Sequence, residues 1–182
     1  MIQATIKRIF FLVLLGAVVV GCSPRFEQSI TTGSFQPVTG RDLRIVTGQT
    51  LYVPAYSEVL LSSTLTHELV ATLAVHNTDL DASIILQSVR YYNTDGELVR
   101  NYVTDPLEIP PLATTGFVVE AQDRTGGWGA NFIVEWVAEE PVYEPVVEAV
   151  MVSRSGTHGI SMISLGRVIS QTQPEDPVQT GD

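Results

Sequence analysis

Apolar and polar residues alternate along the central part of this chain with a period of two. In the segment LVATLAVHN, one face carries Leu69, Ala71, Leu73 and Val75, and the segment NFIVEWV alternates in the same way. Because successive side chains of a strand point to opposite faces, this pattern predicts β-strands with one buried face. Further strands are predicted at residues 51–55, 59–64, 84–92, 98–103, 116–121, 146–153 and 160–168.

The turns between these segments favour an antiparallel arrangement. In NTDG, Asp95 and Gly96 stand where a hairpin requires positive φ, so the flanking strands are expected to pair. In EIPPLATT, neither Pro110 nor Pro111 can donate to a ladder, which predicts a crossing between sheets. No segment of helical spacing rivals the strands. The predicted fold is all-β, a single immunoglobulin-like or fibronectin-like antiparallel β-sandwich of about eight or nine strands.

The N-terminal segment has the pattern of a targeting peptide. Lys7 and Arg8 precede an apolar run at residues 9–20, which is short for a membrane span. The next residues, VVGC, resemble the lipobox of bacterial lipoprotein precursors. That resemblance implies a diacylglycerol and palmitate-type acylation on Cys22, with cleavage just before it. Two alternatives are a cleaved secretory signal with an incidental cysteine and an uncleaved N-terminal membrane helix.

This interpretation divides the chain into four parts. Residues 1–21 are a lipoprotein signal peptide, and residues 22–47 are the lipidated N-terminus and a flexible tether rich in Ser, Thr, Gly and Gln. Residues 48–169 are the β-sandwich domain, and residues 170–182 are a disordered tail.

The net charge of the chain restricts the classes of partner that are expected. Lys7 is the only lysine, so the chain from Cys22 onward has eight arginines against 20 acidic residues and a formal charge of −12. Such a surface repels nucleic acid, and no nucleic-acid partner is expected. Cys22 is the only cysteine, so acylation leaves no thiol for a disulfide and stability must come from a hydrophobic core.

The glycine-rich stretch DRTGGWGAN precedes a strand, whereas a phosphate-binding loop precedes a helix. One interpretation is a tight connection whose glycines relieve backbone crowding. The other is a ligand loop that exposes Trp128. If residues 130–138 and 146–153 form a hairpin through EEPVYEP, this loop faces RSGTHG. The candidate patch for an anionic or sugar-like ligand is then Arg124, Trp128, Asn131, Arg154, Ser155 and His158.

Catalytic and metal-binding patterns are weak. His67, His76 and His158 stand singly, without the paired spacing of a zinc site. Ser155 lies near His158, but no orienting acid or oxyanion hole can be assigned to them. Asp79 and Asp81 are better explained by turn formation than by weak Ca²⁺ binding. We therefore expect no cofactor, no metal and no catalytic residue.

A resemblance to a known family covers nearly the whole predicted domain. The phrases that carry it, in order, are LYVPAYS, LAVHNTD, VRYYNTDGELVRNY, GGWGANFIVEW, VVEAVMV and GISMISLGRVI. In these phrases the chain is similar to the bacterial lipoprotein family called domain of unknown function 3124 (DUF3124). The resemblance implies an uncharacterised envelope protein of a kind common in cyanobacteria, and it assigns no activity.

The sequence therefore predicts a membrane-anchored envelope lipoprotein, a non-enzymatic binding or assembly module with an envelope protein or glycan as its partner. The alternative is a hydrolase-like enzyme, or a binder of anionic or sugar-like ligands, at the end around Trp128 and His158. Ser23 is not the Asp associated with inner-membrane retention, which favours the periplasmic face of the outer membrane. The sequence leaves the oligomeric state undetermined.

Overall fold

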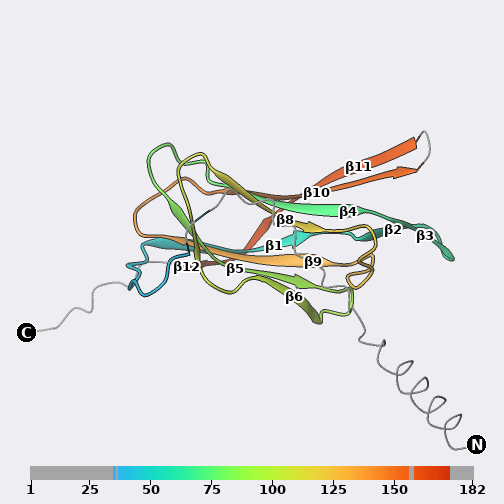
Figure 1. Ribbon diagram of the computed structural model, residues 1–182, viewed down its shortest axis with the longest axis horizontal. Helices are drawn as coiled ribbons and strands as arrows, with labels where there is room; N and C mark the ends of the chain where they lie inside the picture. Colours follow the sequence, from blue (N-terminus) through green and yellow to red (C-terminus); the bar gives the residue numbers. More distant parts are fainter. Residues whose placement is uncertain (1–34, 36, 156–157, 173–182) are drawn as a thin grey trace, which may run out of the picture.

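The computed structural model describes residue 35 and residues 37–155 and 158–172. These residues form an all-β structure of twelve strands, as the sequence predicts (Figure 1). None of the described segments is an apolar helix long enough to cross a membrane. The predicted signal peptide and Cys22 lie outside the described residues.

Two antiparallel sheets make up the body of the fold. The six-stranded sheet has the order β12-β1-β9-β5-β6, with β7 also paired to β5. Its strands are β1 (Thr47–Pro54), β5 (Ile84–Tyr92), β6 (Leu98–Val103), β7 (Leu107–Ile109), β9 (Asn131–Ala138) and β12 (Arg167–Thr172). The four-stranded sheet has the order β11-β10-β4-β8. Its strands are β4 (Val70–His76), β8 (Thr114–Val119), β10 (Val146–Ser155) and β11 (His158–Leu165).

A separate two-stranded ribbon completes the structure. It consists of β2 (Glu58–Ser62) and β3 (Leu65–Glu68), which pair with each other. In Figure 1 this ribbon and the β10–β11 hairpin both extend past the same end of the sandwich. We call this end the ribbon end of the molecule.

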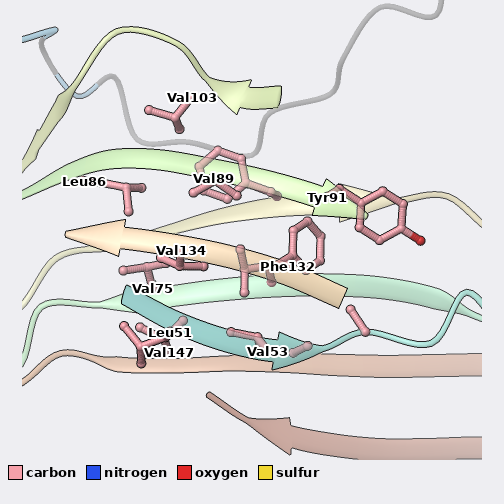
Figure 2. Packing of buried hydrophobic residues seen from close by; sticks show 14 of the residues in the cluster. Leu51, Val53, Val75, Leu86, Val89, Tyr91, Val103, Phe132, Val134 and Val147 are labelled. Carbon is pink, nitrogen blue, oxygen red and sulfur yellow. The ribbon is translucent and has the colours of Figure 1, made fainter. Parts of the chain in front are cut away.

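The core lies between the inner faces of the two sheets. Its largest buried side chains include Trp136, Tyr91, Phe117 and Phe132. The rings of Tyr91 and Phe132 lie 4.9 Å apart between centroids, and Figure 2 shows them side by side with the valines and leucines of both sheets. The alternating apolar positions of β4 and β9 supply much of this core, which is why their pattern is visible in the sequence.

Two predicted turns are confirmed. β5 and β6 form the antiparallel pair expected around NTDG, with Tyr92 opposite Leu98 and Gly96 at a φ of 79°, whereas Asp95 lacks the positive φ predicted for it. The proline-bearing segment after Ile109 carries the chain from β7 in the six-stranded sheet to β8 in the four-stranded sheet. Both outcomes follow from local backbone chemistry that the sequence displays directly.

The predicted hairpin between residues 130–138 and 146–153 is wrong. β9 lies between β1 and β5 in one sheet, whereas β10 pairs with β4 and β11 in the other. The intervening EEPVYEP segment crosses between the sheets, and Pro141 and Pro145 within it cannot continue a ladder. Residues 160–168, predicted as one strand, belong to two strands in different sheets. β11 ends before Gly166, whose N–H donates to Val147 O at 2.8 Å, and the chain enters β12 in the opposite sheet.

Part of the segment expected to be a tether lies against the sandwich. Phe35 packs on the core, and Pro37 forms an isolated bridge with Leu107. Val46 N donates to Ala138 O at 2.9 Å, and β1 begins at Thr47. The ordered domain therefore starts before the first predicted strand, and β12 extends it to Thr172.

The β4–β5 connection depends on a buried aspartate. Asp79 Oδ1 accepts hydrogen bonds from the backbone N–H groups of Asp81 and Ala82, and its Oδ2 accepts one from Tyr143 N at 3.0 Å. These donors, that of Asp81 first, lower the pKa of Asp79 below its ordinary value of 3.8. Turn formation, as expected, explains Asp79, and the same carboxylate also anchors the β9–β10 crossing.

Replacement of Asp79 by alanine is expected to lower the midpoint of thermal unfolding by several degrees at neutral pH, because three backbone donors lose their acceptor. Asp81→Ala is the control, since its exposed side chain makes no such contact in the described structure. A lowered pKa contributes stability at pH values above the ordinary 3.8, and this contribution is lost as the pH falls below that value and the carboxylate is protonated. Scanning calorimetry should therefore show the gap between wild type and Asp79→Ala closing on acidification; a gap independent of pH would contradict this.

Candidate functional site

The loop that carries Trp128 is held firmly at the ribbon end. It joins β8 to β9, and Trp128 is 52% exposed. Gly126 O accepts a hydrogen bond from Thr94 N at 2.9 Å, and Gly127 O accepts one from Ser57 N at 3.3 Å. Arg100 donates to Asp123 at 2.8 Å, which fixes the start of the loop. The indole is thus presented to solvent by a backbone bonded on two sides.

The glycines of this loop have the structural role that the first interpretation predicts. A Cβ on Gly126 would lie 1.8 Å from Oη of Tyr91, and Gly127 has a φ of 73°. Burial raises the pKa of Tyr91 to about 12, so the phenol beneath the loop stays protonated across the physiological range. Close packing of the backbone on this ring explains the glycine, and no ligand is needed to account for it.

The six residues of the predicted patch fall into two groups on different elements. Arg124, Trp128 and Asn131 belong to the β8–β9 connection and the start of β9. Arg154, Ser155 and His158 belong to the β10–β11 hairpin, where Ser155 is opposite His158 and Arg154 is opposite Gly159. The side chains of Ser155 and His158 lie outside the described residues.

Two members of the first group are already engaged. Arg124 forms an ion pair with Glu68 of β3. Asn131 is only 9% exposed and pairs through its backbone with Pro54 and Tyr92. Trp128 is the member whose side chain is displayed to solvent.

The β2–β3 ribbon and its flanking residues are bonded to the Trp128 loop and to β10. Ser57 O accepts from Leu69 N at 2.8 Å while Ser57 donates to the Trp128 loop. On the other side, His67 Nε2 lies 2.8 Å from Ser153 Oγ of β10. The sequence does not predict this cluster of His67, Glu68 and their partners. His67 and Ser153 are 86 residues apart, so no local spacing indicates their contact.

The His67–Ser153 pair has the separation of a base and a nucleophile but lacks the remaining parts of a catalytic triad. A triad requires a carboxylate on the second imidazole nitrogen and donors for an oxyanion. Across the described residues, no carboxylate oxygen lies within 4.0 Å of His67, and Glu68 pairs with Arg124. The described side chains also include no cluster of three His, Cys, Asp or Glu residues suited to a metal ion. The pair therefore fastens the ribbon to β10.

The outer face of the four-stranded sheet carries several exposed apolar side chains beside Glu148, whose carboxylate lies 3.9 Å from His76 Nε2. On β10 and β11, Val150 is opposite Ile163, and Ile163 and Leu165 are 64% and 69% exposed. We define the outer apolar face by the outward residues Val146, Val150, Val152, Ile163 and Leu165. The outer face of the six-stranded sheet also carries a charged pair, Arg90 with Glu135. A contiguous exposed apolar surface of this kind is typical of an interaction site.

Comparison with known families bears on these features. The model of the family "Protein of unknown function (DUF3124)" matches residues 48–169. This chain belongs to the DUF3124 family. The match spans β1 to the third residue of β12, so it includes the Trp128 loop, the ribbon and the outer apolar face.

One solved structure shows a weak likeness to this chain. A solved structure, "Crystal Structure of Thermotoga maritima 1070", is 14% identical to this DUF3124 chain and covers 65% of it and 92% of its own chain, with a TM-score of 0.40. No curated protein shows significant sequence similarity to the chain.

Gly126→Ala is expected to reduce the free energy of unfolding by about 2 kcal/mol or more, because the new methyl group overlaps the Tyr91 hydroxyl and the loop must shift. The matched control is Gly159→Ala, whose Cβ would sit at an ordinary 3.5 Å from Ser153 O. Urea titration of both variants measures the difference. Equal stability of the two variants would refute the close packing of the loop on Tyr91.

Proposed function

We propose that this DUF3124 protein is a lipid-anchored, non-enzymatic binding module of the bacterial cell envelope. In this proposal, acylated Cys22 holds the sandwich at the membrane, on the periplasmic face of the outer membrane. The outer apolar face then binds another envelope protein. Confinement of both proteins to one surface raises their effective concentration, so a modest intrinsic affinity is sufficient.

The observation that carries the binding role is the exposure of the outer apolar face. Burying such side chains against a partner removes apolar area from water at roughly 25 cal/mol per Å². The register extends the same surface onto β4, where Val70 is opposite Val152 and Ala74 is opposite Glu148. The face thus combines exposed apolar side chains on paired strands with one acidic residue, Glu148, a mixture that fits another protein better than a small polar ligand.

Support for the anchor comes from the sequence. The charged start, the apolar run and VVGC resemble a lipoprotein signal. More than one acyl chain is needed for stable attachment, and lipoprotein processing supplies them.

A second candidate function is capture of a sugar-like or anionic ligand at the ribbon end, and the solvent-exposed Trp128 favours it. Aromatic rings bind sugars through their apolar faces and bind cations through their π-systems. Arg124 contributes less to this role than the sequence suggests, because Glu68 compensates its charge.

The anchor is tested by metabolic labelling with palmitate in the native host. The wild-type chain is expected to incorporate label and to fractionate with membranes, and Cys22→Ala is expected to lose the label. A mature N-terminus that begins elsewhere than at residue 22, measured by mass spectrometry, would refute lipidation.

The binding face is tested by crosslinking in cells with Val152→Glu and Ile163→Glu. Each charge is expected to abolish capture of a partner that the wild type captures, since it must be desolvated on binding. Leu80→Glu is the control, because Leu80 is as exposed as Ile163 and lies in the β4–β5 loop, away from the outer apolar face. Capture that survives both face variants, or is lost equally in the control, would overturn this assignment.

A further inference from the structure

The β2–β3 ribbon is small and exposes several apolar side chains to solvent. Leu60, Leu61 and Leu65 are each more than half exposed, and they surround the turn between the two strands. Leu61 lies at the register shift between Leu60 and Ser62 and has no partner across the ribbon, so its exposed side chain adds to the apolar surface of Leu60. A two-stranded ribbon that pairs with no sheet has nothing with which to cover either face.

The same tip carries no charge. Residues 59–66, VLLSSTLT, contain no acidic or basic side chain, although the chain from Cys22 onward has a formal charge of −12. The first acidic residues are Glu58 and Glu68, which are opposite each other at the base. Glu68 is compensated there by Arg124. The tip is therefore the part of an acidic molecule that can approach an anionic headgroup layer without repulsion.

The tip is also preformed. Thr64 N donates to Ser62 Oγ at 3.3 Å, so a side chain within the turn satisfies a backbone donor. At its base the ribbon is fastened by the His67–Ser153 contact and by the bonds of Ser57 to the Trp128 loop. A turn with satisfied polar groups and fixed leucines loses little on entering an apolar layer.

We propose that the tip of the β2–β3 ribbon inserts into the interfacial layer of the bilayer to which the protein is anchored. This inference rests on the proposed lipid anchor. Insertion at a second point fixes the orientation of the sandwich, with the ribbon end toward the lipid. Trp128 lies at the same end, where an amphipathic indole suits the headgroup region.

The chain length permits this arrangement. Thirteen steps separate Cys22 from Phe35, the first described residue, and they span at most about 45 Å when extended. Pro37 is bridged to Leu107, and Leu107 is opposite Leu86. Leu86 is opposite Trp136, which in turn is opposite Gln49 of β1, so Pro37 lies at the same height along the sheet as Gln49. From there to the ribbon tip is about 30 to 40 Å at the rise of a strand. Anchor and tip can therefore reach the same membrane.

A lipid surface fits the tip better than a protein does. A stable protein interface buries about 800 Å² on each partner, far more than three leucines at a narrow turn supply. Insertion into lipid requires only an uncharged apolar projection and no complementary shape. The outer apolar face, by contrast, spreads over the paired strands β10 and β11.

The test uses the acylated full-length protein in vesicles of phosphatidylcholine and phosphatidylglycerol. Cys22 is the only cysteine and is blocked by lipid, so Leu61→Cys provides one site for an environment-sensitive fluorophore. Leu80→Cys is the matched control, 67% exposed in the loop after β4, at the opposite end from the ribbon. The Leu61 probe is expected to shift to the blue and to be quenched by brominated lipid, and the Leu80 probe is expected to do neither.

Two further measurements sharpen the result. Adding Leu60→Ser and Leu65→Ser to the Leu61→Cys protein is expected to halve the quenching or reduce it further, while high salt should leave it unchanged because the tip is uncharged. Circular dichroism confirms that the variants remain folded.

Unquenched Leu61 in protein that floats with vesicles would overturn tip insertion and leave the anchor standing. Protein that fails to float would overturn both, and shielding that requires an added envelope protein would assign the tip to a protein partner.

Discussion

Burial of one face of each sheet against the other is the constraint on which the rest of this structure depends. Trp136, Tyr91 and Phe132 of the six-stranded sheet fill the space opposite Phe117 and the small side chains of β4. Since the chain contains a single cysteine, no internal disulfide can share this task. Each sheet therefore needs the other, and every connection that passes between them has to satisfy its own polar groups.

The connections between the two sheets determine which side chains are exposed at each end of the sandwich. At one end Asp79 accepts three backbone donors and ties the β4–β5 and β9–β10 connections together. At the other end the Trp128 loop packs on Tyr91 and is bonded to the base of the ribbon. The first end exposes Leu80, Leu112 and Tyr143 among acidic residues, while the second presents an indole and three leucines at an uncharged tip. This asymmetry gives the molecule a direction relative to a surface.

The sequence predicts the fold class because alternation is a local property. The pattern of β4 and the Asp95–Gly96 turn needed no knowledge of distant residues. The β9–β10 connection was misjudged because a hairpin and a crossing satisfy the same alternation, and only Pro141 and Pro145 distinguish them. The His67–Ser153 contact could not be predicted, since it depends on how far the ribbon extends before it turns. The same applies to Arg124, whose partner is set by the packing of β3.

The position of β12 has a consequence for how the protein reaches its folded state. β1, near the start of the domain, is flanked by β9 and by β12, the last strand of the described structure. A chain that emerges from its N-terminus cannot complete the six-stranded sheet until almost all of it has been delivered. Long-range pairing of this kind slows folding. Closure by the final strand therefore makes completion of the chain and completion of the sheet a single event.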